Sequence, residues 1–298
     1  MAQVRLQNWK REITYRAHSL EFAQSADDIV RVVKDRGRYP GPVRVKGSHH
    51  STTRCVVNEG GTVIDVTRMN KILGIDRTAK TITMQAGVLH IDAAKALERE
   101  GLQFYVNVEI GNMTVGSGAC GSTKDASFFS AAEGWEFGQV ASYAIGIKAV
   151  NAEGRLIEVI EADGALMAAM RSSYGMLGVI YEVTFRVKEI APKAVEHIRY
   201  HIAEDRQSLF SYTRKSAALT LDPVSTGGPG WQDYLVAYNA FCSRHNGTPL
   251  FNQTPGVTPS QAQKAFGPEI GQFMEIRQKH DPGGRFLVPF FRNLFEGT

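Results

Sequence analysis

The chain runs from a short apolar strand into a small, hydroxyl-rich turn in the segment Val43-Arg44-Val45-Lys46-Gly47-Ser48-His49-His50-Ser51-Thr52. Glycine and serine carry little side-chain bulk, so a ligand can approach the backbone closely, and the N–H groups of such a turn can converge on an anion. The two adjacent histidines add titratable, nucleophilic rings. The segment is therefore either an anion-binding loop or a polar surface turn with two incidental histidines.

Composition narrows the possible partners. The 298 residues are 43% hydrophobic and 21% charged, and the net charge of +4 is spread along the chain without a Lys/Arg block, so no nucleic-acid partner is expected. The three cysteines form no CxxC pair, so neither a disulfide framework nor a metal site is expected. No run of about 18 apolar residues and no secretory signal are evident, so we expect no membrane span and a cytoplasmic location.

Local patterns predict a small α/β unit around the opening segment. Ser25 precedes two aspartates and a spaced apolar stripe, which predicts a helix that ends near Gly37. Alternating and β-branched runs predict strands, and two further segments are predicted as helices. The predicted strands are 43–45, 62–66, 81–87, 139–150, 155–161 and 179–187, and the predicted helices after the first are 91–101 and 166–171.

After Pro192 the pattern of apolar and polar residues changes, and this residue is predicted to mark a domain boundary. The patterns there predict strands over 195–202 and 234–241, a helix over 207–215, a long loop over 246–259 and one or two helices over 261–279.

A second glycine-rich loop spans Gly111 to Asp125 and contains Gly116-Ser117-Gly118-Ala119-Cys120-Gly121, a formal GxGxxG match. A Rossmann site needs this motif at the first strand-to-helix turn, with an acidic residue about 20 positions later, whereas here the motif lies mid-chain and Asp125 comes too soon. A Walker A loop needs a lysine before Ser122, and none is present. An NAD-dependent dehydrogenase is therefore a weak alternative, and a close-packed structural loop stays open.

Five stretches, taken in order, resemble the FAD-linked oxidase family with a vanillyl-alcohol-oxidase, or PCMH-type, flavin domain. Residues 44–51 resemble its R-x-x-G-x-G-H-S loop, 111–121 its second glycine-rich loop, 146–154 its G-x-x-x-V-x-A-D-G hairpin, 175–180 its L-G-V-V-T strand entry, and 279–287 the ending of its sugar- and aldonolactone-oxidase branch. The resemblance implies an α+β fold. A two-subdomain FAD-binding domain would span 1–190, completed by 275–298, with a short α+β substrate (cap) domain over 191–274.

The resemblance also implies FAD, with its pyrophosphate held by backbone amides of the first loop. Many members of the family link a histidine to the 8α-methyl carbon of the flavin, and His50 stands at that position, so a covalent bond through His50 is expected. The glycine that usually precedes the linking residue is His49 here, and the cysteine of bicovalent members is Asn112. The implied cofactor-binding residues are Arg44, Gly47, Ser48, His49, His50, Ser51, Gly111, Thr114, Val115, Gly116, Gly118, Cys120, Gly121, Gly178 and Ile180.

The function that this resemblance implies is oxidation of an alcohol (CH–OH donor) or a related small organic substrate, by hydride transfer to flavin N5. Val115 stands where the family lines oxygen's route, and its bulk leaves both O2 and another electron acceptor possible. The family's catalytic lysine has no evident counterpart. The candidate catalytic residues are Asn252, Gln253, His245 and Arg292, with Arg244, His197 and His201 as further candidate bases or cations. A non-catalytic protein with a structural flavin is the alternative.

Overall fold

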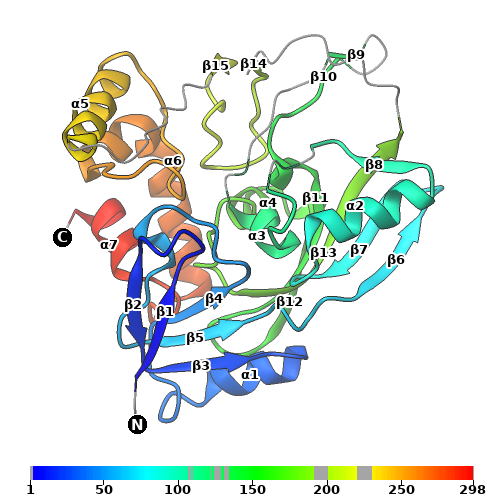
Figure 1. The fold of residues 1–298 in the computed structure, drawn as a ribbon, viewed down its shortest axis with the longest axis horizontal. Helices are drawn as coiled ribbons and strands as arrows, with labels where there is room; N and C mark the ends of the chain where they lie inside the picture. Colours follow the sequence, from blue (N-terminus) through cyan, green and yellow to red (C-terminus); the bar gives the residue numbers. More distant parts are fainter. Residues whose placement is uncertain are drawn as a thin grey trace.

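A computed structural model describes residues 3–106, 108, 110–121, 123, 129–130, 134–190, 201–219 and 230–297. Helices and strands are mixed in it, and the predicted α+β class is confirmed. Figure 1 shows a small sheet of β3, β4 and β5, a larger sheet that includes β11, β13, β7 and β6, and the helices α5, α6 and α7 gathered at one end.

The small sheet is parallel and has the order β3-β5-β4, formed by β3 (Ser19–Phe22), β5 (Thr62–Asp65) and β4 (Val43–Lys46). The central strand β5 is buried along its whole length, which is consistent with the two apolar residues, Val63 and Ile64, at its centre. The helix α1 (Ala26–Lys34) begins at a Ser25 capping box, as predicted, and connects β3 to β4. The turn 47–52 follows directly after the carboxyl end of β4.

The larger sheet is antiparallel and is built around the long strand β13 (Val179–Glu189). The other strands of this sheet, in the order β12-β11-β13-β7-β6 with β8 also on β13, are β12 (Leu156–Ile160), β11 (Ala144–Val150), β7 (Thr81–Gln85), β6 (Ile72–Asp76) and β8 (Leu102–Phe104). Helices α2 (His90–Arg99), α3 (Val115–Cys120) and α4 (Ala165–Met170) follow from the intervening segments. Short 3-10 turns, η1 (Arg54–Val56), η2 (Val140–Tyr143) and η3 (Glu161–Asp163), and the two-residue pair β9 (Phe129–Ser130) and β10 (Gly134–Trp135) complete this half.

An N-terminal hairpin was not predicted. Its strands β1 (Val4–Gln7) and β2 (Thr14–Ala17) pair in antiparallel fashion. A small separate core holds it, in which Leu6, Tyr15 and Ala17 pack with Val57 and Val63. This core joins the hairpin to the segment that follows the turn 47–52.

The second half corrects two of the predictions. Residues 234–241, predicted as a strand, lie in the helix α5 (Trp231–Arg244), because the aromatic residues recur at spacings of three and four, which places their rings on one helix face. Residues 207–215, predicted as a helix, form turns. There the Asp205 carboxylate accepts hydrogen bonds from Gln139, from Ser142 and from the backbone N–H of Gln207, and these bonds compete with helical ones.

Of the predicted strand 195–202, only His201–Ile202 is described, as β14 paired with β15 (Ala218–Leu219); residues 191–200 lie outside the described part.

The C-terminal segment consists of α6 (Pro259–His280) and α7 (Pro289–Glu296). One or two helices were predicted over 261–279, and this range lies within α6, which has a kink at Phe266 with a φ of −135°, just before Pro268. Arg285, between the two helices, donates hydrogen bonds to the carbonyls of Val32 and Tyr39 at 3.0 and 2.8 Å. The end of the chain is thus joined directly to the first αβ unit.

None of the helices in the described ranges has the length and apolar character that crossing a bilayer requires. Within the same residues no group of three or more His, Cys, Asp or Glu side chains is arranged to hold a metal ion.

Candidate functional site

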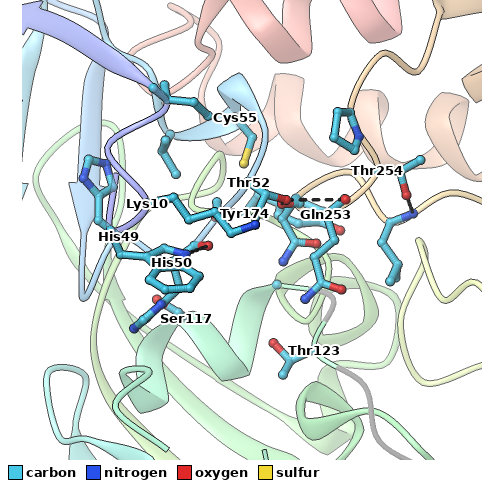
Figure 2. Close-up of a pocket in the computed structure, with 18 of the residues that line it drawn as sticks. Lys10, His49, His50, Thr52, Cys55, Ser117, Thr123, Tyr174, Gln253 and Thr254 are labelled. Carbon is cyan, nitrogen blue, oxygen red and sulfur yellow. Dashed lines mark hydrogen bonds between the residues drawn. The ribbon is translucent and has the colours of Figure 1, made fainter. Parts of the chain in front are cut away.

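A cavity of about 760 Å³ lies where the N-terminal hairpin, the end of β4 with the turn 47–52, the loop around α3 and the segment 250–255 meet. Figure 2 shows side chains from these segments facing one another, with Lys10 and His50 on one side and Gln253 and Thr254 on the other. The volume lies within the range of roughly 300–1,000 Å³ that ligand pockets occupy.

The turn after β4 is docked onto the second glycine-rich loop. Gly47 lies directly against the side chain of Thr114, so a Cβ at position 47 would collide with it. The Ser48 hydroxyl donates a 2.6 Å hydrogen bond to the carbonyl of Asn112. The sequence therefore needs a glycine at position 47 and a small hydroxyl at position 48, because two backbone segments approach closely here.

The ring of His49 is bound to the hairpin. Its Nδ1 donates to the carbonyl of Gln7 at 2.9 Å, and its Nε2 lies 3.3 Å from the Tyr15 hydroxyl, whose pKa is raised by burial, so that this hydroxyl stays protonated and donates. Burial lowers the pKa of His49 to about 4, so the ring is neutral at neutral pH. The backbone of His49 has a φ of +62°, the left-handed conformation in which glycine is favoured.

The ring of His50 is half-buried on the cavity side, and Figure 2 shows it directed away from that of His49. The Trp9 ring lies 5.3 Å from it, centroid to centroid. Burial lowers the pKa of His50, and a hydrogen bond with the Asn112 side chain opposes part of this effect. Its Nδ1 atom is buried and has no hydrogen-bond partner among the described residues.

The second loop forms the cavity wall next to the turn. Gly116 and Gly118 of α3 are packed so closely against Ala86 and His90 that a Cβ on either would collide. Cys120 lines the cavity, its Sγ donates to the Gly116 carbonyl at 3.3 Å, and burial raises its pKa to about 11, so it is a protonated thiol. These glycines thus serve close packing of α3 on the larger sheet, and the cysteine is a buried small residue.

The segment 250–255 is fastened to the turn by the residues that follow His50. The backbone N–H of Thr52 donates to the Asn252 carbonyl at 3.0 Å, and the Thr53 hydroxyl donates to the Phe251 carbonyl at 2.8 Å. Asn252 and Gln253, two of the predicted catalytic residues, therefore line the same cavity as His50.

The remaining predicted residues lie elsewhere. His245 lines a second cavity of about 760 Å³ beside α5, and Arg292 is on α7, where it forms a 3.4 Å ion pair with Glu296. Ile180 is buried in β13, where it pairs with Ala149. Of the predicted cofactor residues, Gly111, Thr114, Val115, Gly116, Gly118, Gly178 and Ile180 do not line the first cavity, whereas Arg44, Gly47, Ser48, His49, His50, Ser51, Cys120 and Gly121 do.

His197 and the side chain of His201 lie outside the described residues, so neither candidate can be placed in the site.

Several cavity residues were not predicted from the sequence, among them Trp9, Lys10 and Tyr174. Tyr174 is held by Arg44, whose Nη1 donates a hydrogen bond to the Tyr174 carbonyl. The only sequence signal for the first two was a turn rich in polar residues between the alternating runs 4–7 and 14–17.

The donor set of this cavity suits an anionic dinucleotide. No acceptor among the described residues takes the backbone N–H groups of Ser48 to Ser51. Buried Nε of Arg44 and Nδ1 of His50 also have no described hydrogen-bond partner. The charged lining residues are Lys10, Arg44, Lys46 and a single carboxylate, Glu12. Unpaired donors and net positive charge are what a diphosphate requires.

Comparisons with known proteins agree with this site. The family described as FAD binding domain matches residues 19–160. L-gulonolactone oxidase of Mus musculus is 28% identical over 186 residues, which cover 61% of this chain and 40% of that protein. L-gulono-1,4-lactone dehydrogenase of Mycobacterium tuberculosis is 25% identical over 276 residues, which cover 86% of this chain and 61% of that protein. The chain thus spans only part of the length of these relatives.

Among solved structures, 6-hydroxy-D-nicotine oxidase of Arthrobacter nicotinovorans aligns with a TM-score of 0.47 and 22% identity, over 57% of this chain and 36% of that one. A Physcomitrella patens BBE-like 1 variant aligns with a TM-score of 0.49 and 17% identity, over 60% of this chain and 37% of that one. Residues 19–160 thus match the FAD binding domain family, and the chain resembles proteins named as lactone oxidases and dehydrogenases.

Proposed function

We propose that this protein is an FAD-dependent oxidoreductase that oxidises an alcohol or a related small CH–OH donor and passes the electrons to O2 or another acceptor. The observation that carries the proposal is the meeting of the turn 47–52, the second loop and the segment 250–255 at one electropositive cavity. The FAD binding domain match and relatives named as lactone oxidases and dehydrogenases support it. Its parts would be an FAD-binding region, 1–190 with 275–298, and a substrate region, 191–274.

The residues that would hold FAD follow from the unpaired donors. The backbone N–H groups of Ser48 to Ser51 would bind the pyrophosphate, and the Arg44 guanidinium, with its buried unpaired Nε, would add positive charge beside them. When bound, FAD supplies a two-electron acceptor for the hydride of a CH–OH carbon. Asn252 and Gln253 would orient the substrate hydroxyl by hydrogen bonds, since their amides cannot act as bases.

His245 would contact substrate only through the second cavity, which shares the wall residues Tyr238, Asn239, Leu250 and Thr254 with the first. Arg292 lines neither cavity, so any role it has would act through α7.

We assign the covalent flavin link to His50. Burial lowers the pKa of His50, which favours the neutral ring with a nitrogen lone pair for attack, and Nδ1 has no partner among the described residues. The His49 ring, by contrast, is engaged by Gln7 and Tyr15. The new C–N bond to the 8α carbon replaces one C–H and one N–H bond; two protons leave to solvent and two electrons leave to the acceptor.

A visible spectrum before and after acid precipitation tests this function. A yellow pellet supports a covalent link, and a yellow supernatant supports FAD held without a bond. A colourless protein that takes up no added FAD would refute the proposal. His50→Ala should move the colour from pellet to supernatant, whereas Cys120→Ser, a change in the second loop, should leave it in the pellet.

Bleaching of the flavin band under a panel of small alcohols and lactones, without air, then separates an enzyme from a protein with a structural flavin. Readmission of air tests O2 as the acceptor, because rapid return of the band marks an oxidase and a persistent bleach marks a dehydrogenase that uses another acceptor.

A further inference from the structure

The turn of the N-terminal hairpin, residues 8–13, forms one wall of the first cavity although it precedes the residues that match the family. Trp9, Lys10, Glu12 and Ile13 all line the cavity. Trp9 is 48% exposed although it lines the cavity. A hairpin of two four-residue strands is only marginally stable by itself, so the contacts that hold this turn at the cavity matter.

The hairpin binds three consecutive carbonyls of the turn 47–52. The backbone N–H of Trp9 donates to the His49 carbonyl at 3.1 Å, and its indole Nε1 donates to the His50 carbonyl at 3.0 Å. The Asn8 side-chain amide donates to the Ser51 carbonyl at 3.2 Å. These bonds fix the direction in which each of the three peptide planes faces.

That direction determines where the N–H groups of the turn point. In a planar trans peptide the carbonyl of one residue and the N–H of the next point in opposite directions. Carbonyls of His49 and His50 that face the hairpin therefore turn the N–H groups of His50 and Ser51 away from it. Neither N–H has an acceptor among the described residues, so both are left to a ligand.

We propose that Trp9 is a positioning residue of the cofactor site, which holds the His50 peptide and ring so that the unpaired N–H groups and the imidazole face the bound ligand. The tilted ring contact, at 5.3 Å and 51°, fixes the imidazole from one side while the indole N–H fixes the backbone. The inference rests on the proposed function, because the ligand is taken to be FAD.

Two readouts test it. The first is the dissociation constant for FAD in a His50→Ala background, where no bond to the flavin can form. Loss of the indole hydrogen bond in Trp9→Phe should weaken FAD binding about fivefold, and loss of the ring as well in Trp9→Ala about tenfold or more. Gln7→Ala is the matched control, since among the described residues that side chain bonds only Thr14 of the same hairpin; it should stay within about twofold of the background.

The second readout is the titration of His50 in otherwise wild-type protein, followed by NMR of carbon-labelled histidine. Removal of the covering indole in Trp9→Ala should raise the pKa of His50 toward its ordinary value, while Trp9→Phe should change it little. Unchanged FAD affinity and an unchanged His50 titration in Trp9→Ala would overturn the inference. If the wild-type protein is colourless and takes up no added FAD, the proposed function has failed, and the titration alone decides whether Trp9 positions the ring.

Discussion

The left-handed backbone at His49 allows a sharp test of the turn geometry. Its φ of +62° is a conformation that costs a residue with a Cβ roughly 1–2 kcal/mol and glycine almost nothing. We therefore compare His49→Gly with His49→Ala. Both variants lose the same imidazole and the same two hydrogen bonds, to Gln7 and Tyr15, so those contributions cancel in the comparison.

The expected order is that His49→Gly is more stable than His49→Ala by about 1 kcal/mol, since the backbone term favours glycine and the greater freedom of glycine in the unfolded chain removes part of it. Both should be less stable than the wild type, because the buried Tyr15 hydroxyl loses its acceptor at a cost of about 1–3 kcal/mol. Urea unfolding followed by circular dichroism measures the differences.

The matched control is the same pair of changes at Lys95, an exposed position inside α2, where the helix favours alanine over glycine by about 1 kcal/mol. The sign of the Gly/Ala difference must therefore reverse between the two positions. If His49→Ala equals or exceeds His49→Gly in stability, the turn does not need a left-handed residue and the inferred presentation of its N–H groups is wrong.

Further predictions concern charge and reactivity. The pKa of His49 is about 4 in the folded protein and about 6.5 in the unfolded chain, so between these pH values the unfolded state binds more protons. The contribution of His49 to stability should therefore be fully present above pH 6.5 and should be lost toward pH 4, by up to about 1.4 kcal/mol per pH unit. Urea unfolding midpoints measured across this pH range would show the loss. His90→Leu should leave stability unchanged or raise it by about 1 kcal/mol and lessen the acid loss, since both ring nitrogens are buried without described partners; a large destabilisation would mean that they are satisfied. Lys10→Gln should weaken FAD binding roughly two- to fivefold at low salt, an effect that 0.5 M salt should remove. Cys242 alone should react quickly with a thiol reagent in native protein, because the other two cysteines are buried.

Sequence patterns predicted the parts of the fold that local chemistry specifies. The Ser25 cap and the alternation in β7 and β13 each act within a few residues, and each is present. The resemblance to the family's first flavin loop, and not the local composition, selected the residues of 44–51 that line the cavity.

What could not be predicted depends on distant contacts. The hairpin β1–β2 is stable only with Val57 and Val63 against its inner face, and four-residue strands carry little periodic signal. The aromatic run 234–241 has a composition typical of strands, and its helical spacing becomes decisive only with Trp231 included. Turns at 207–215 follow from the buried Asp205, whose partners in η2 lie more than sixty residues away in the sequence.

The left-handed conformation of His49 depends on the N-terminal hairpin. The family pattern has glycine where the turn requires a positive φ, and this chain has a histidine with that same φ. A left-handed histidine costs roughly 1–2 kcal/mol, and its two ring hydrogen bonds contribute on the order of 1 kcal/mol each, so the ring contacts offset the backbone cost. Both acceptor and donor for that ring, Gln7 and Tyr15, belong to the N-terminal hairpin. The departure from glycine and the hairpin therefore depend on one another. In a chain without the hairpin the same histidine would be strained, and the carbonyls that Trp9 now holds would be free to turn toward the cavity.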